Sequence, residues 1–300
     1  MTARRGLRRV HDALARSTAA AVHHLPILEA PFVGIGRRAG TLRPARVFYG
    51  RAASELARRW QKDGTSYRHL RVAGQDLRLD VAEFYAHDHF FHRRPYEPGL
   101  AACLARVLRP GDTFVDAGAN QGYFSLLAAK LVGPSGRVVA FEPHGEARER
   151  LERHLELNEL HGRVEVHPIA LSDRTGVALM HQAHHNSLAS LVPDQSPVRH
   201  LVAFGAPFDV PTVRFDEWRT RHAAGAIRLM KIDVEGAELM VLNGMPETLR
   251  VGLEAVVLET VPDSAADRLL RTAGYTVTTL DTYPDGAENR LYTPGSLTMC

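Results

Sequence analysis

The stretch "FVDAGANQGYFS", residues 114–125, decides the fold of this 300-residue chain. It begins as an apolar strand, reaches Asp116, passes two glycines four positions apart and continues into an apolar helix. A glycine turn between a strand and a helix is typical of open α/β sheets, which bind ligands beyond the carboxyl ends of their strands. Because Gly118 and Gly122 do not match the G-x-G-x-x-G fingerprint of dinucleotide sites, a pyrophosphate ligand is disfavoured.

Strand-like and helical stretches alternate on both sides of this turn. The strands are expected in "TFVDAG", "GRVVAFEP", "VEVHPIALSD", "IRLMKIDV", "EAVVLET", "YTVTTL" and "NRLYTP". Alternation of this kind predicts an α/β fold with a parallel sheet and helices on both faces.

The chain divides by charge. Residues 1–60 hold twelve Arg and three acids, a formal charge of +9, whereas the whole chain carries +3, so the remainder is −6. We expect residues 1–66 to form a basic, mostly helical N-terminal segment and residues 67–300 to form the main domain. Within the main domain, residues 181–211 show little periodicity and are expected to be an irregular insert that acts as a substrate lid.

The basic segment has two interpretations. It is either a solvated Arg-rich surface or an arm for an anionic membrane or nucleic acid. Leu7, Val10 and Leu14 fall on one helical face beside several Arg, which is a weak signal for peripheral membrane contact. The early apolar run is interrupted by His, Glu and Pro, so no secretory signal or membrane span is expected. With only Cys103 and Cys300, the chain is expected to be cytoplasmic and free of structural disulfides.

Three acids follow successive strands. Asp116 precedes the glycine turn, Glu142 ends the next strand, and Asp173 ends "ALSD". Asp116 would repel phosphates but attract an ammonium or sulfonium group, Glu142 can accept from two ribose hydroxyls, and Asp173 can accept from an adenine amino group. Together they predict an adenosyl ligand with a cationic tail, namely S-adenosyl-L-methionine.

Longer motifs carry a family resemblance. "YEPGLAACLARVLRPGDTFVDAGANQGYFSLLA", "VVAFEP", "ALSD" and "RLMKIDVEGAELMVLNGM" resemble the FkbM-type S-adenosylmethionine-dependent methyltransferases over roughly residues 67–295. The resemblance implies a seven-stranded, Rossmann-like methyltransferase sheet that is mostly parallel with an antiparallel last strand. It also implies O-methylation of small molecules, often sugars or natural products. Its cofactor positions match Asp116, Gly118, Asn120, Gly122 and Glu142.

The acceptor chemistry is expected beside "KIDVEG". An alcohol acceptor must lose a proton, and Asp233 and Glu235 are the carboxylates after the fourth strand. Glu235 also reads as a helix cap. His184, in the insert, is a third candidate for the base. Lys231 needs a partner inside a central strand, and an ion pair with Asp233 or Glu259 is favoured over a role as base.

Metal binding is not expected. His87, His89 and His92 with Asp88 lack a regular helical spacing. A divalent ion between Asp233 and Glu259 is a second alternative, but "ETVPD" lacks the Asp-Asn pair of catechol-type O-methyltransferases.

The function expected is therefore transfer of a methyl group to a hydroxyl of a small-molecule or glycan acceptor, such as a glycolipid. One alternative is an RNA methyltransferase, although no aromatic stacking motif or Asn/Asp-Pro-Pro-aromatic loop is evident, so nucleic acid is not an expected partner. Another is a non-catalytic scaffold, which would not need Asp116 and Glu142 together. The sequence leaves the oligomeric state open.

Overall fold

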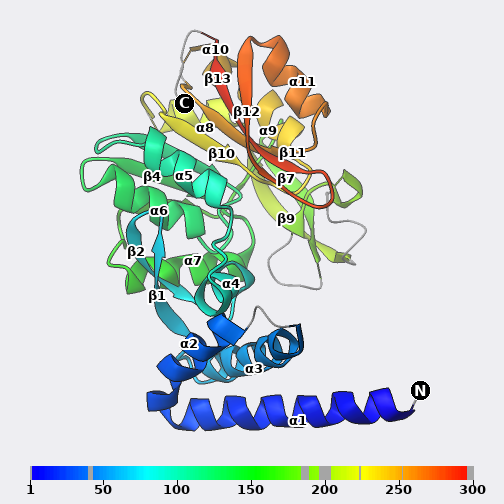
Figure 1. Ribbon diagram of the computed structural model, residues 1–300. Coiled ribbons are helices and arrows are strands. Elements are labelled where there is room, and N and C mark those ends of the chain that lie inside the picture. The colour runs from blue at the N-terminus through cyan, green and yellow to red at the C-terminus, as the bar shows by residue number, and fades with distance from the viewer. Residues whose placement is uncertain are drawn as a thin grey trace. The chain divides into compact units, whose positions relative to one another are not determined.

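The computed structural model describes residues 2–39, 43–183, 189–195, 204–222, 224–251 and 253–295 (Figure 1). The chain divides into two compact units, one ending at Tyr96 and the other beginning at Glu97. Each unit has its own packing and is treated by itself.

The first unit combines helices with a β-hairpin. Its elements are α1 (Thr2–His24), η1 (Pro26–Leu28), α2 (Glu29–Ala39), α3 (Arg43–Lys62), β1 (Tyr67–Val72), β2 (Gln75–Asp80) and α4 (Phe84–His92). The hairpin predicted from Tyr67 onward is present and antiparallel. Arg68 joins it to the helices, because its guanidinium lies 4.1 Å from the Trp60 ring centroid and its Nε lies 2.7 Å from a Glu29 carboxylate oxygen. The compact unit therefore extends past the expected boundary at residues 66/67 and includes the hairpin. Across the described residues, no helix is long and apolar enough to cross a membrane.

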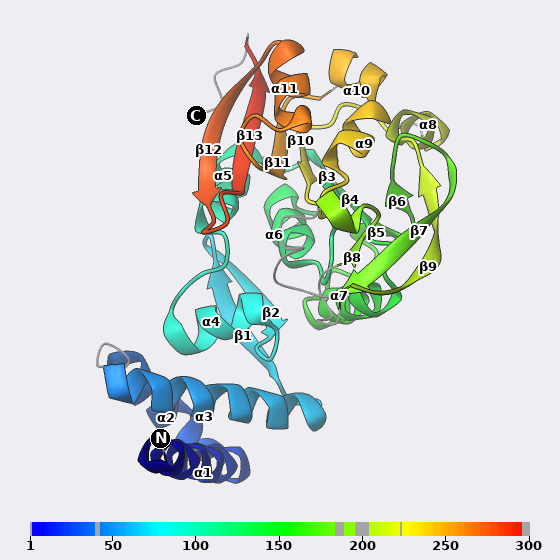
Figure 2. The same ribbon diagram turned by 90° about the vertical axis from the view of Figure 1, so that its right-hand side faces the viewer.

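The second unit is built on a seven-stranded sheet with the order β12-β13-β11-β10-β3-β4-β5 (Figure 2). The strands are β3 (Thr113–Ala117), β4 (Arg137–Phe141), β5 (Val164–His167), β10 (Leu229–Ile232), β11 (Val256–Thr260), β12 (Tyr275–Thr282) and β13 (Glu288–Pro294). β13 runs antiparallel to both of its neighbours, whereas the pairs from β11 to β5 are parallel. The expected mostly parallel sheet with an antiparallel last strand is thus confirmed.

Helices form two layers against this sheet. One layer holds α5 (Pro98–Val107), α6 (Tyr123–Val132) and α7 (Gly145–Leu157), and the other holds α8 (Phe215–Arg221), α9 (Glu238–Asn243), α10 (Pro246–Val251) and α11 (Ala265–Thr272). In the first layer α6 contacts both α5 and α7, and in the second α10 contacts α8 and α9 while α11 contacts α9, so both faces of the sheet are covered (Figure 1). On one face of the sheet Val115, Phe141, Ile232 and Leu258 pack with residues of α8, α9 and α11, and strand residues that alternate with them, such as Phe114, are buried as well. Burial on both faces explains why these strands read as continuous apolar runs.

A smaller four-stranded sheet corrects the prediction for the insert. Its order is β6-β9-β7-β8, from β6 (Ala170–Leu171), β9 (Phe204–Val213), β7 (Gly176–Ala183) and β8 (Ala189–Ser190). β7 and β9 pair antiparallel through most of their length. The expectation of an irregular segment over residues 181–211 is therefore wrong at both of its ends, which are strands, while residues 184–188 and 196–203 lie outside the described part. A short helix, η2 (Pro193–Gln195), follows β8.

Candidate active site

The site lies where the strand order reverses. β3 has β4 on one side and β10 on the other, and Ala117 at the end of β3 is paired with Ile232 at the end of β10. Gly118 comes next, with φ of +77°, and a Cβ there would lie 1.8 Å from the Asp233 carbonyl oxygen. A side chain at this position would push apart the two loops that form the crevice, so the close approach requires glycine.

Glu142 closes the other side of the glycine turn. Its Oε2 accepts the Asn120 backbone N–H at 2.7 Å and its Oε1 accepts that of His144 at 2.8 Å. Burial raises the pKa of Glu142 to about 7, against the lowering effect of these two amides. Each carboxylate oxygen has room for one further donor, so the ionised side chain can accept from two neighbouring hydroxyls. These residues fit the ribose diol of an adenosyl ligand.

The Asp116 carboxylate contacts other buried side chains of the second unit. Its Oδ2 accepts from Ser125 Oγ at 2.6 Å and its Oδ1 lies 3.4 Å from Lys231 Nζ, with the residue only 1% exposed. Burial raises the pKa of Asp116, while the Lys231 charge opposes the rise. Asp116 thus supports the floor of the crevice, and its direct contact with the cofactor stays a prediction.

Lys231 forms the ion pair that the sequence favoured. Its Nζ lies 3.0 Å from Asp233 Oδ2 and donates to the Gly118 carbonyl oxygen at 3.4 Å. Burial alone would lower the pKa of Lys231, but the charges of Asp233 and Asp116 outweigh it and raise the pKa above its ordinary value. The amine stays protonated, so it orients Asp233 and Asp116 rather than taking up a proton.

A carboxylate cluster gathers at the ends of β10 and β11. Asp233 directly follows Ile232, which pairs with Leu258, and Glu259 follows Leu258 on the neighbouring strand. Burial raises the pKa of Glu259 well above its ordinary value, and the charges of Asp233, Glu97 and Glu235 raise it further. A carboxyl group with these neighbours is a stronger base than an isolated one.

Glu97 belongs to the same cluster, although the sequence pattern gave no separate signal for it. It immediately precedes α5, and its Oε2 accepts from Asn289 Nδ2 at 2.9 Å. The same amide donates to the Tyr283 hydroxyl at 2.8 Å, and Asn289 is the cross-strand partner of Glu259. Burial, followed by the charge of Glu97, raises the pKa of Tyr283. The motif "YEPG" contains Glu97, but the local sequence does not predict that this residue contacts β13.

The loop after β10 links the site to the smaller sheet. The Glu235 carbonyl oxygen accepts from Ser190 Oγ of β8 at 2.6 Å. Glu235 was expected to cap the helix that follows, but Glu238, the first residue of α9, bonds the amides just before it. Its carboxylate accepts from Gly236 N at 2.9 Å and from Val234 N at 3.4 Å. Burial raises the pKa of Glu238 to about 7. Glu235 itself has φ of +54°, so the loop holds it in a strained conformation beside Asp233.

Two predicted residues stand apart from this arrangement. Asp173 follows β6 in the smaller sheet, not the third parallel strand, which ends at His167, so that part of its placement was wrong. Its Oδ1 accepts from Ser172 Oγ at 3.3 Å. His184 lies outside the described residues.

Histidines meet carboxylates at two other places. Donor atoms of His87, Asp88 and His92 lie within 4.8 Å of one another, although their spacing had argued against a cluster. Burial lowers the pKa of His92, the charge of Asp88 opposes this, and the charges of Arg94 and Arg37 lower the pKa further and would oppose a bound cation.

Glu165, His167 and His222 form the second such group. Arg137 Nη2 already lies 2.6 Å from Glu165 there, so the carboxylate has a cationic partner.

Comparisons with known proteins identify the family of the chain. Residues 116–277 match the family model described as the methyltransferase FkbM domain. The chain is 31% identical over 197 residues to the 31-O-demethyl-FK506 methyltransferase FkbM of Streptomyces tacrolimicus, covering 57% of this chain and 75% of that enzyme. It is 28% identical over 152 residues to the 2-O-methyltransferase NoeI of Sinorhizobium fredii, covering 47% of this chain and 60% of that one.

Solved structures are more distant. The fibrillarin of Aeropyrum pernix, crystallised with bound S-adenosyl-L-methionine, aligns with a TM-score of 0.39 at 15% identity, covering 75% of this chain and 81% of that one. The family match, by contrast, spans more than half of the chain and starts at Asp116 in the glycine turn. The chain belongs to the FkbM methyltransferase family, and it is a methyltransferase that uses S-adenosyl-L-methionine as its cofactor.

Proposed function

We propose that the protein methylates a hydroxyl group of a small-molecule or glycan acceptor, in the manner of an enzyme of natural-product or glycolipid biosynthesis. The observation that carries the proposal is the pair of carboxylates Asp233 and Glu259 at the ends of adjacent strands, with Lys231 as their cationic neighbour. A hydroxyl needs such a base, because it must lose its proton as the new bond forms. Two relatives named for methylation at oxygen, the 2-O-methyltransferase NoeI and the 31-O-demethyl-FK506 methyltransferase FkbM, support the same class.

In this proposal the glycine turn and its neighbours bind the cofactor. Gly118 and Gly122 bring the backbone close, Asn120 orients its amide to Glu142, and Glu142 accepts from the ribose hydroxyls. Asp116 supports the turn from below, and Asp173 is kept as the partner of the adenine amino group.

The chemistry divides between two acids. When bound, S-adenosyl-L-methionine supplies a methyl group on a positively charged sulfur, which leaves as a neutral thioether. The ion pair with Lys231 holds the Asp233 carboxylate in place, which suits it to orient the acceptor hydroxyl. Glu259 has the raised pKa of a stronger base and takes the hydroxyl proton as the oxygen–carbon bond forms. Glu235 and His184 remain alternative bases.

Glu259→Gln is expected to reduce kcat by about 10²–10⁴-fold, because the variant cannot accept the proton. Wild-type kcat should rise with pH through the raised pKa of Glu259, since only the ionised form is a base, and the variant should lose this inflection. The assay follows release of the demethylated cofactor with a panel of glycosylated, hydroxylated natural products, and the position of the new methyl is read by NMR.

The matched control is Glu254→Gln. Glu254 precedes the other end of β11 and pairs with Arg228, so its loss should leave kcat unchanged. Methyl transfer to nitrogen or carbon instead of oxygen would overturn the proposal. A Glu259→Gln enzyme with wild-type kcat and pH profile would remove Glu259 from the mechanism.

Glu142 provides a second test, on binding alone. At about pH 6, below the Glu142 pKa of about 7, roughly a tenth of the carboxylates are ionised, so cofactor affinity should fall about tenfold from its value at about pH 8. Glu142→Gln should lower affinity by about 10–100-fold and remove this pH dependence, because charge-assisted bonds to hydroxyls are lost. Calorimetric titration with the cofactor and its demethylated product measures both effects. Glu146→Gln, an exposed neighbour on α7, is the control, and equal affinity of Glu142→Gln and wild type would exclude the ribose assignment.

A further inference from the structure

The first unit exposes an unusual amount of apolar surface. Of the twelve large hydrophobic side chains that are exposed among the described residues, eight lie before Tyr96, in the smaller unit. They are Val10, Leu14, Leu25, Ile27, Leu28, Ile35, Val47 and Phe84. Scattered exposed residues need no explanation, but a concentration of them marks an interaction site.

Helix α1 has two apolar faces. Ala15, Ala19 and Val22 are buried on the face that packs along α3. Val10 and Leu14 lie one turn apart on another, exposed face of α1, and Leu25 and Ile27, which is 83% exposed, follow just beyond the C-terminal end of the helix. Figures 1 and 2 show α3 crossing one side of α1. We name the four exposed side chains Val10, Leu14, Leu25 and Ile27, on α1 and just after it, the outer face of α1.

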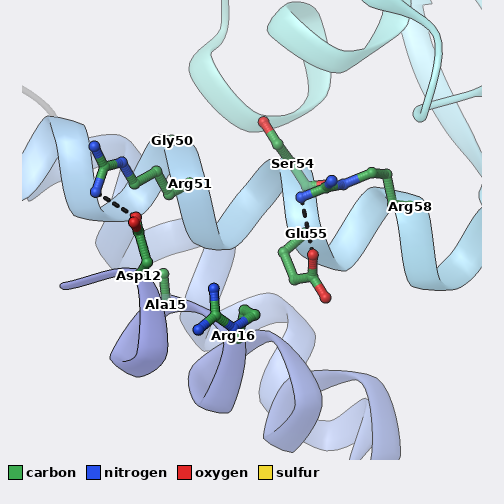
Figure 3. Close-up of a pocket in the computed structure, with 8 residues that line it drawn as sticks. All are labelled: Asp12, Ala15, Arg16, Gly50, Arg51, Ser54, Glu55 and Arg58. Carbon is green, nitrogen blue, oxygen red and sulfur yellow. Dashed lines mark hydrogen bonds and ion pairs between the residues drawn. The ribbon is translucent and has the colours of Figure 1, made fainter. Parts of the chain in front are cut away.

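The carboxylates of α1 and α3 already form ion pairs with arginines. Asp12, the only acid of α1, bonds Arg51 of α3, and Glu55 bonds Arg58 at 2.9 Å (Figure 3). These pairs line a groove of about 470 Å³ between the two helices. The outer face therefore carries no acid that would repel an anionic partner, whereas α1 brings five Arg.

Charge decides which partner fits. Residues 1–60 carry twelve Arg against three acids, so a second copy of the chain would bring two segments of +9 together. Nucleic acid would match the charge but offers no apolar phase for Ile27 and Leu14. An anionic bilayer satisfies both, since a basic helix with an exposed apolar face lies in the plane of the lipid headgroups. We propose that the outer face of α1 binds the protein peripherally to an anionic membrane.

Vesicle binding of the full chain tests this proposal. The protein should co-sediment with vesicles of phosphatidylcholine and phosphatidylglycerol far better than with phosphatidylcholine alone, and binding should weaken as salt rises. Ile27→Asp and Leu14→Asp should each reduce affinity for the anionic vesicles by about tenfold or more, because a charge enters the apolar contact. Both side chains are exposed, so thermal melting should show unchanged folding.

The matched control is Val251→Asp, an exposed valine of α10 in the second unit, 58% exposed, which should bind vesicles like wild type. Equal binding to both vesicle types, or no loss in Ile27→Asp and Leu14→Asp, would overturn the proposal. A dimer in solution that Leu14→Asp dissociates would assign the face to a second copy. Binding to duplex RNA in place of vesicles would assign it to nucleic acid.

Discussion

Gly118→Ala is expected to weaken cofactor binding about a hundredfold or more while leaving most of the chain folded. The new Cβ would lie 1.8 Å from the Asp233 carbonyl oxygen, a distance at which backbone atoms must separate. The backbone φ of +77° adds a cost of about 1–2 kcal/mol for any residue with a Cβ. Relief requires the loop after β10 to move, and that loop carries Asp233. We expect the dissociation constant for S-adenosyl-L-methionine to rise about a hundredfold or more, equivalent to about 3 kcal/mol, as measured by calorimetric titration.

Gly133→Ala separates the collision from the dihedral strain. Gly133 also has a positive φ, of +65°, but a Cβ there meets nothing within 4 Å. With ψ of −168°, Gly133 lies in a region that is essentially restricted to glycine, so this variant should lose about 1–3 kcal/mol of stability and keep the wild-type dissociation constant. If Gly118→Ala bound the cofactor as Gly133→Ala does, the close approach of the two loops would not be needed for binding.

The part of the site that sequence could predict is local. Gly118, Gly122 and Glu142 lie at the ends of strands that read as apolar runs, and the parallel sheet brings successive strand ends to one edge. The pairing of Lys231 with Asp233 could also be predicted from the sequence, since residues two apart on a strand share a face. The alternation of strands and helices predicted the parallel sheet, whereas its seven strands and its antiparallel last strand were implied by the family resemblance.

The remainder depends on long-range pairing. Glu97 accepts a hydrogen bond from Asn289, which lies 192 positions later in the chain, and no sequence motif around either residue predicts this contact. Asp173 was misplaced because "VEVHPIALSD" reads as one strand, while the chain turns after His167 and joins β6 to β9 of another sheet. A short apolar run in the sequence predicts a strand, but it does not predict the strand with which it pairs or the sheet that it joins.

Lys231→Met is expected to cause the largest loss of stability of any single change at the site. Lys231 is 3% exposed and lies within 3.4 Å of Asp116 and 3.0 Å of Asp233, so methionine would leave two carboxylates without their cation. Removing one partner of a buried ion pair costs about 3–5 kcal/mol. Because the folded-state pKa of Lys231 lies above 10.5, its stabilising charge is present in full at neutral pH and is lost only as pH rises beyond that value. Urea unfolding at neutral pH measures the change.

The double variant Lys231→Met/Asp116→Asn distinguishes an unpaired charge from lost packing. The asparagine side chain would keep a carbonyl oxygen for Ser125 while removing one buried charge, so the double variant should be more stable than Lys231→Met alone. Lys130→Met is the control, because the Lys130 amine is only partly buried and donates to the Asn158 carbonyl oxygen, a contact worth about 1 kcal/mol. If Lys231→Met and Lys130→Met lost the same free energy of unfolding, Lys231 would not hold the two acids. The positive charge that balances Asp116 and Asp233 would then have to come from another residue.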